Sequence, residues 1–139
     1  MRITTKGRYA LRAVLSLALA PDSKPVSIRQ IAQTEDLSPE FLEQIFFKLK
    51  KTGVIISSRG PGGGFKLNRN PEDISLLEIL EGSGEETTLT PCSNGNDDCP
   101  NESNCIAHKV WVRAAEEMKN YLSGITLKNI VENNGDLPD

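Results

Sequence analysis

Apolar residues recur at helical spacing in the N-terminal half of the chain. Over residues 4–19 they fall at i, i+3 and i+4, which predicts an amphipathic helix. A second, shorter helix is predicted at 27–34, where Ser27 and Gln30 have the spacing of a capping box. The predicted buried faces consist of Tyr9, Ala10, Ala13, Val14, Leu17 and Ala18 in the first helix, and Ile28, Ile31 and Ala32 in the second.

A third helix is predicted from Ser38 to Lys51. Ser is a favoured N-cap, and Pro39 is preorganised for the first helical position. Glu40 then lies at the positive end of the helix dipole, and Gly53 can terminate the helix. The predicted buried stripe is Phe41, Leu42, Ile45, Phe46 and Leu49.

Two short strands are predicted next, at residues 54–58 and 65–68. Residues 59–64 between them are strong turn formers. With a tight turn at 35–37 between the second and third helices, the order is helix, turn, helix, hairpin. This order predicts a winged helix-turn-helix over residues 1–81.

The C-terminal half is predicted to contain one long helix. Before it, Ser75 and Glu78 form a capping box that opens a short helix, and residues 82–104 are polar and acidic, which predicts a loop. The long helix spans residues 105–123, and a short one follows at 127–132. The apolar stripe of the long helix is wider than a small domain can cover, which favours packing against a second copy. That stripe is Ile106, Val110, Trp111, Ala114, Ala115, Met118 and Leu122.

The predicted fold class is therefore mainly α with a small β-hairpin wing: a winged helix-turn-helix plus a long C-terminal dimerisation helix. Four units are expected along the chain. They are the winged helix-turn-helix at 1–81, a cysteine-bearing loop at 82–104, the long and short helices at 105–133, and a loose tail at 134–139.

The charge is divided unevenly between the two halves. The net charge of −3 and pI near 5.3 argue at first against a nucleic-acid partner. Residues 1–75, however, contain 12 Lys and Arg against 7 Asp and Glu, whereas residues 76–139 contain 4 against 12. A basic half can place a local positive surface on DNA while the whole molecule stays acidic.

One face of the third helix carries side chains suited to reading DNA. Gln44 can pair with an adenine edge, and Glu43 can accept from a cytosine amino group. Lys48 and Lys51 suit phosphates. Ser38, Pro39 and Glu40 stand at the end that would enter the major groove, and Phe47 shares the face. The alternative is an ordinary solvated helix face.

The turn at residues 59–64 is expected to act as a thin wing. It lacks the Lys-Ser/Thr of a phosphate-binding loop and joins two strands. Glycines let a backbone approach DNA closely, and Arg59 can enter a narrow minor groove. The alternative is a plain flexible hairpin. The predicted wing residues are Arg59, Gly60, Pro61, Gly62, Gly63 and Gly64.

Three cysteines and the only histidine form the pattern Cys92-x6-Cys99-x5-Cys105-x2-His108. An odd number of thiols suits a disulfide framework poorly, and clustered cytosolic thiols point to metal or redox chemistry. Both zinc and iron–sulfur clusters take such ligands. The gaps are wider than those of zinc knuckles, but spacing alone leaves both metals open. Cys105 and His108 share a helix face, which favours His108 as a ligand over a bystander.

Five carboxylates are expected to crowd the same region. Thiolates beside carboxylates repel one another, so an empty loop is predicted to be poorly ordered. Bound metal would neutralise part of the charge and fold the loop. The five are Glu85, Glu86, Asp97, Asp98 and Glu102.

Several stretches together resemble the IscR-type and NsrR-type regulators of the Rrf family, bacterial winged-helix proteins that sense iron–sulfur status, nitric oxide or redox state. The resemblance covers nearly the whole chain. Its motifs are MRITTKGRYALRA at 1–13, SPEFLEQIFFKLKKTGVI at 38–55, RGPGGGFKL at 59–67, ISLLEILEG at 74–82, and the three cysteines before a long helix.

The resemblance implies a homodimer whose long helices cross, with one helix-turn-helix per half-site of an inverted-repeat operator. It implies Cys92, Cys99 and Cys105 as ligands of an iron–sulfur cluster, with His108 completing a 2Fe–2S site. The first cysteine gap is six where five is common in the IscR branch, so a 4Fe–4S cluster stays open. Arg8 and Arg12 occupy the region where other members recruit an N-terminal ligand.

Two other functions remain open. One is a zinc- or thiol-based redox-sensing DNA-binding regulator, and the other, of a different class, is an iron–sulfur carrier or electron-transfer protein. An enzyme is not expected, because one histidine and no nucleotide-binding loop leave little for catalysis. The chain has neither a signal peptide nor an apolar stretch of about 20 residues, which predicts a cytoplasmic protein without a membrane partner.

Overall fold

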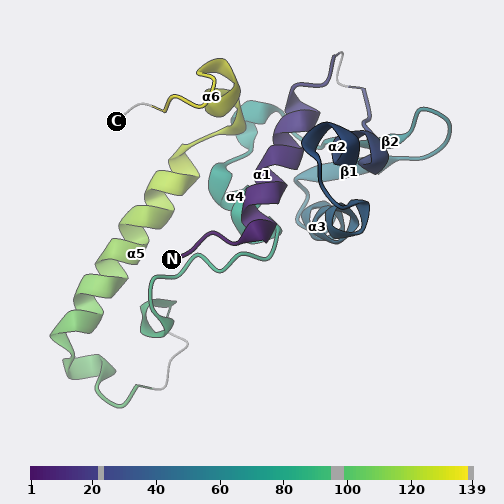
Figure 1. Cartoon of the computed structure of the whole chain (residues 1–139). Helices are drawn as coiled ribbons and strands as arrows, with labels where there is room; N and C mark the ends of the chain where they lie inside the picture. Colours follow the sequence, from purple (N-terminus) through teal and green to yellow (C-terminus); the bar gives the residue numbers. More distant parts are fainter. Residues whose placement is uncertain (22–23, 95–98, 138–139) are drawn as a thin grey trace.

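The computed structural model describes residues 1–21, 24–94 and 99–137. Figure 1 shows short helices and a β-hairpin grouped together, with one long helix along their side. This is the mainly helical arrangement with a hairpin that the sequence predicts. Its elements, with η for a 3-10 helix, are α1 (Thr5–Ala18), α2 (Ile28–Glu35), α3 (Pro39–Lys51), β1 (Ile55–Ser58), β2 (Gly64–Leu67), η2 (Pro71–Asp73), α4 (Leu76–Gly82), η3 (Pro91–Asn94), η4 (Glu102–Asn104), α5 (Ile106–Gly124) and α6 (Leu127–Glu132).

Capping residues set the helix ends close to where the sequence predicts them. The hydroxyl of Ser27 accepts from the amide of Gln30, and the Gln30 side chain accepts from the amide of Ser27. Helix α2 ends at Glu35, one residue further than predicted, and its C-cap Asp36 has a left-handed φ of 54°. Gly53, with φ of 81°, follows α3 as predicted.

The hairpin is attached to the segment before α2. Strands β1 and β2 pair antiparallel, with Ser58 opposite Gly64. Val26 and Phe65 exchange two backbone hydrogen bonds of 2.8 Å each. A Cβ at Gly64 would lie 2.4 Å from the carbonyl oxygen of Val26, so a larger residue would push β2 away. The wing is thereby held at a fixed angle to the helix-turn-helix.

The core lies between α1, α3 and the hairpin, and α4 and α6 extend it. Phe46 is fully buried and meets Phe65 edge to face at 5.0 Å between ring centroids. We call the winged helix-turn-helix at residues 1–81 the head. The chain leaving α5 returns to the head, because the amide of Leu127 donates to the carbonyl of Ile74 at 2.9 Å. The largest buried side chains include Phe46, Ile31, Leu42, Ile45, Leu49, Ile55, Ile74, Ile79, Leu127, Val14 and Val54.

Residues 82–104 depart from the loop that the sequence predicts. Ser83, Glu85 and Thr87 are buried, and η3 and η4 are short helical turns. The sequence pattern did not predict this burial, because burial is inferred from apolar residues and these three are polar. Of the predicted acidic cluster, Asp97 and Asp98 lie outside the described residues. No helix in the described part of the chain is long and apolar enough to span a membrane.

Candidate DNA interface and metal-ligand segment

Helix α3 presents an exposed polar face directly opposite its buried stripe. Its buried residues are Leu42, Ile45, Phe46 and Leu49. The predicted reading residues of the helix are all exposed, namely Ser38, Pro39, Glu40, Glu43, Gln44, Lys48 and Lys51, together with Phe47. No other element of the described chain covers them. The structure therefore brings this set onto one accessible surface, as a groove-reading helix requires.

The N-terminal end of α3 is built by its own cap. Ser38 accepts a hydrogen bond from the amide of Phe41 at 3.4 Å and donates its hydroxyl to Glu40 at 2.9 Å. A backbone hydrogen bond and the Ser38 hydroxyl hold the pKa of Glu40 below its usual value. Glu40 is therefore a carboxylate at the positive end of the helix.

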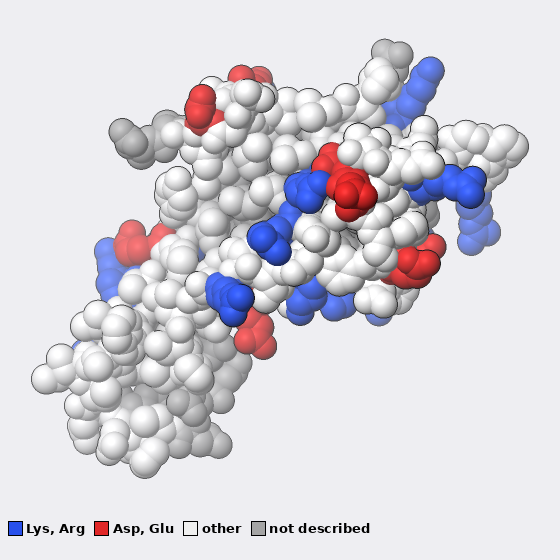
Figure 2. Space-filling model, in the orientation of Figure 1, with Lys and Arg blue, Asp and Glu red and all other residues white. Residues whose placement is uncertain are grey.

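The six wing residues divide into tip and base. Arg59, Gly60, Pro61 and Gly62 are exposed, whereas Gly63 and Gly64 are half-buried at the start of β2. Figure 1 shows the loop between β1 and β2 projecting beyond the helices. In Figure 2 Lys and Arg side chains gather around α3 and the hairpin, and the end of the molecule where α5 begins is largely uncharged on this face. Basic side chains thus accompany the predicted DNA-reading elements, with acidic side chains among them on this face.

A junction at residues 82–85 joins α1 to α3. The Lys48 side chain of α3 lies over Gly84, where a Cβ would meet Nζ at 2.9 Å, and Lys6 of α1 donates to the Gly84 carbonyl at 3.3 Å. Gly82 packs on Leu49, whose methyl group would lie 3.1 Å from an added Cβ. The start of the cysteine-bearing segment therefore touches the recognition helix itself.

Glu85 of this junction caps α1 from a distance in sequence. One carboxylate oxygen accepts from the amide of Thr4 at 3.0 Å, the amide of Gly7 at 2.9 Å and the hydroxyl of Thr4. Burial would raise the pKa of Glu85, but these hydrogen bonds and the charge of Lys6 outweigh it and lower that pKa. The prediction that Glu85 crowds the cysteines is wrong, because α1 offers it three donors.

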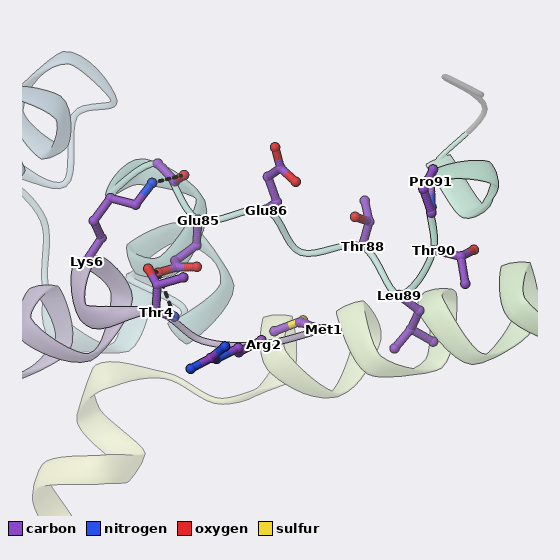
Figure 3. A pocket seen from close by; sticks show the side chains of 11 residues that line it. Met1, Arg2, Thr4, Lys6, Glu85, Glu86, Thr88, Leu89, Thr90 and Pro91 are labelled. Carbon is purple, nitrogen blue, oxygen red and sulfur yellow. Dashed lines mark hydrogen bonds between the residues drawn. The ribbon is translucent and has the colours of Figure 1, made fainter. Parts of the chain in front are cut away.

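Sequence reasoning missed this contact, although Gly7 carried a signal. A glycine in the first turn of a helix weakens it unless something must approach closely. A Cβ at Gly7 would lie 2.7 Å from the Glu85 side chain. Figure 3 shows the cleft beside this contact, of about 1010 Å³, between the N-terminal residues and the chain from Gly84 to Pro91. Glu86 lines the cleft and is exposed.

The four predicted metal ligands lie further along the chain than this junction, from η3 to the first turn of α5. Cys92 is in η3, which packs against α5, and its sulfur lies 3.2 Å from the Thr90 hydroxyl. Cys105 is the N-cap of α5 and precedes His108 by one turn. Cys99 and His108 line one hollow of about 540 Å³ together with Pro100, Ser103 and Lys109. Two of the four ligands thus share a hollow at the start of α5.

All three cysteines are free thiols. Within residues 1–21, 24–94 and 99–137, no group of three His, Cys, Asp or Glu side chains lies close enough to hold a metal ion. The donor set itself, three thiols and an imidazole, is the kind that iron–sulfur clusters take. The donor types therefore fit such a group, and of the four residues Cys99 and His108 line one hollow.

A helix-turn-helix, a hairpin wing and an exposed basic reading face define a winged-helix transcription regulator that binds DNA. Comparison with known proteins gives the particular family. The Rrf2 model, described as an iron-dependent transcriptional regulator, matches residues 3–133, and the chain belongs to that family. The resemblance is thereby confirmed. The mainly helical structure with a hairpin wing agrees with the predicted fold class, while the use of α5 as a dimerisation helix stays a prediction.

Named relatives agree with this assignment. The transcriptional regulator IscR of Vibrio cholerae is 37% identical over 134 residues, covering 96% of this chain and 77% of the relative. The structure of CymR, the global cysteine regulator of B. subtilis, aligns with a TM-score of 0.76 at 29% identity, covering 96% and 98% of the two chains. The structure of T. potens IscR aligns with a TM-score of 0.73 at 28% identity, covering 100% of this chain and 93% of that one. These relatives are regulators, which confirms that the chain is not an enzyme.

Proposed function

We propose that this regulator binds an iron–sulfur cluster through Cys92, Cys99, Cys105 and His108, and that cluster occupancy changes which DNA it recognises. The observation that carries the proposal is the placement of the ligand segment. One end forms the hollow at the start of α5, and the other end is the junction at residues 82–85. The description of the family as iron-dependent supports the choice of metal.

The chain's own residues supply the ligands and the charge around them. Cys105 caps α5 without a side-chain hydrogen bond to the helix, so its sulfur is available at the positive helix end. When bound, an iron–sulfur cluster would supply a group that is gained or lost with iron supply and oxidants. We propose 2Fe–2S over 4Fe–4S because the resemblance to IscR-type regulators implies His108 as the fourth ligand. His108 of α5 and Cys99, which precedes η4, line the same hollow, so binding both would hold the chain at Cys99 against the start of α5.

Coupling to DNA runs through the junction. Lys6 and Glu85 hold it to α1, and Lys48 lies over it from α3. Ordering of the ligand segment therefore biases the position of the recognition helix. Glu43 is the proposed reader of this change, because a carboxylate facing DNA is repelled unless a cytosine amino group meets it. A coupling of about 1–3 kcal/mol is enough to alter operator choice.

We place α3 in the major groove and Arg59 of the wing in the adjacent minor groove. Gln44 and Glu43 then read base edges, and Lys48 and Lys51 contact phosphates. The exposed backbone at Gly60–Gly62 is suited to close approach to the DNA. This arrangement uses the predicted residues of α3 and of the wing tip, which are exposed, while Gly63 and Gly64 are half-buried at the base of the wing.

Two such heads are proposed to be held by α5. One side of the helix buries Ala115 against the head, while a second side leaves large apolar residues in solvent. These are Ile106, Val110, Trp111 and Tyr121, which are 81%, 55%, 44% and 55% exposed. A second copy is the proposed occupant, and its two-fold symmetry requires an inverted-repeat operator with half-sites about 34 Å apart.

The test is to purify three proteins anaerobically: the wild type, a variant with Cys92, Cys99 and Cys105 all changed to Ala, and Ser103→Ala. Ser103 lines the same hollow but carries no thiol, so it is the matched control. Wild type and Ser103→Ala should contain iron and sulfide and be coloured. The triple variant should contain neither and should select a different set of operators from random DNA at one salt concentration.

Each part of the proposal can fail separately. If the wild-type protein is colourless and contains zinc, the cluster is excluded and the function is that of a zinc- or thiol-based regulator. A triple variant that keeps full iron and sulfide would refute the ligands. Equal operator preference with and without the cluster would leave the cluster as a structural element, and an absence of salt-dependent DNA binding would favour an iron–sulfur carrier.

A further inference from the structure

Phe47 is an aromatic residue on the DNA-reading face of α3. It is 61% exposed, whereas Phe46 beside it is fully buried. Every residue of α3 is described, and Phe47 is its one large apolar side chain in solvent. A single exposed apolar side chain is common on soluble proteins, so exposure alone assigns Phe47 no role. What distinguishes Phe47 is its position, on the same exposed face of α3 as Glu43 and Gln44.

The ring is held by a neighbouring cation. Lys51 lies one turn further along α3, and its Nζ is 4.5 Å from the centroid of the Phe47 ring. A cation at that distance is attracted to the ring face and limits the rotation of both side chains. The ring therefore presents one face to Lys51 and keeps its edge and remaining face available.

Phe47 lies on the same stripe of α3 as the two proposed base-reading residues. Phe47 follows Gln44 by three residues and Glu43 by four, so all three lie on one stripe of the helix. Three residues advance the helix by about 4.5 Å, which is a little more than one base-pair step. In the proposed placement of α3, the ring then faces the base pair next to the one that Gln44 reads.

We infer that Phe47 recognises a thymine in the operator by contact with its C5-methyl group. Thymine is the base that offers an apolar group in the major groove, and an aromatic ring is an apolar partner for it. The inference rests on the proposed placement of α3. It adds a specificity residue that none of the hydrogen-bonding side chains on the helix can replace.

The experiment uses operators selected from random DNA with the full-length wild-type protein. Each thymine is replaced in turn by deoxyuridine, which keeps base pairing and removes the methyl group alone. One position should weaken wild-type binding by about fourfold, the ratio that corresponds to about 0.8 kcal/mol for one buried carbon. At that position Phe47→Ala should bind the two operators equally, whereas Phe47→Leu should keep part of the discrimination.

A Gln44→Ala arm separates this inference from the placement of α3. If Gln44→Ala changes the preferred base at one position and no deoxyuridine penalty disappears in Phe47→Ala, Phe47 does not read thymine. If neither variant changes base preference, α3 does not lie in the major groove and the proposed interface is wrong. Circular dichroism of Phe47→Ala should match the wild type, because the ring is exposed.

Discussion

Replacing Glu85 with Ala removes the cap that joins the ligand segment to α1. The carboxylate accepts three hydrogen bonds from Thr4 and Gly7 at the first turn of that helix. Thr4 is the N-cap, but its own side chain makes no capping bond. The first turn of α1 therefore depends on a residue 78 positions beyond Gly7.

The expected cost follows from these contacts. Loss of an N-cap acceptor costs about 0.5–2 kcal/mol, and bonds to a charged group are worth about 1.5–3 kcal/mol. We expect Glu85→Ala to lower the free energy of unfolding by about 2–3 kcal/mol. Glu85→Gln keeps an acceptor oxygen and loses only the charge near the helix end, so it should cost about 0.5–1 kcal/mol.

The pH dependence has a definite sign. The pKa of Glu85 is lowered from its usual 4.5 in the folded chain. A carboxyl with a depressed pKa contributes stability that is fully present above its unfolded pKa and is lost as pH falls through the folded one. The stability difference between the wild type and Glu85→Gln should therefore be constant near neutral pH and shrink as pH falls below about 4.5. Other carboxyls, such as Glu78, are common to both proteins and cancel.

Urea unfolding at one protein concentration measures these differences. Glu86→Ala is the matched control, because Glu86 is the next residue and is exposed. Its stability should lie within about 0.5 kcal/mol of the wild type. The reasoning is refuted if Glu85→Ala is no less stable than Glu86→Ala, or if the difference between wild type and Glu85→Gln does not change down to pH 3.

Two further predictions concern the DNA interface and the dimer. Arg59→Ala should weaken operator binding at fixed salt by about 1–3 kcal/mol, whereas Arg113→Ala on α5 should not; equal dissociation constants for wild type and Arg59→Ala would exclude the wing from the interface. Trp111→Glu should turn a dimer into a monomer in sedimentation equilibrium at micromolar concentration, while Asn120→Glu, which adds the same charge on the polar side of α5, should leave it dimeric. A monomeric wild type would contradict the proposed use of α5.

Local chemistry made most of the head predictable from sequence. Ser27 and Ser38 act as the caps that their neighbours imply, and Gly53 ends α3. The exposed face of α3 followed from periodicity, because fixing the buried stripe fixes the opposite face. The one-residue extension of α2 depends on Asp36 adopting a left-handed conformation, and sequence pattern alone does not decide this.

Contacts between distant segments were not predictable in the same way. The bond from Gly7 to Glu85 spans 78 residues, so no local period reveals it. The role of Gly64 depends on Val26, which reaches β2 from before α2. Cysteine spacing likewise identifies donors without fixing their geometry, since Cys99 and His108 share a hollow only through the path that the chain takes before α5.

The use of Glu85 as a cap has a consequence for regulation. A capping hydrogen bond from the Thr4 side chain itself would also stabilise α1, but it would leave the head independent of the ligand segment. A cap drawn from residues 82–85 makes the first turn of α1 and the position of Lys48 depend on the same short stretch of chain. Because that stretch leads directly to Cys92, the proposed ordering of the ligands would act on both helices at once. Glu85→Gln should therefore weaken the effect of the cluster on operator choice more than it weakens cluster binding.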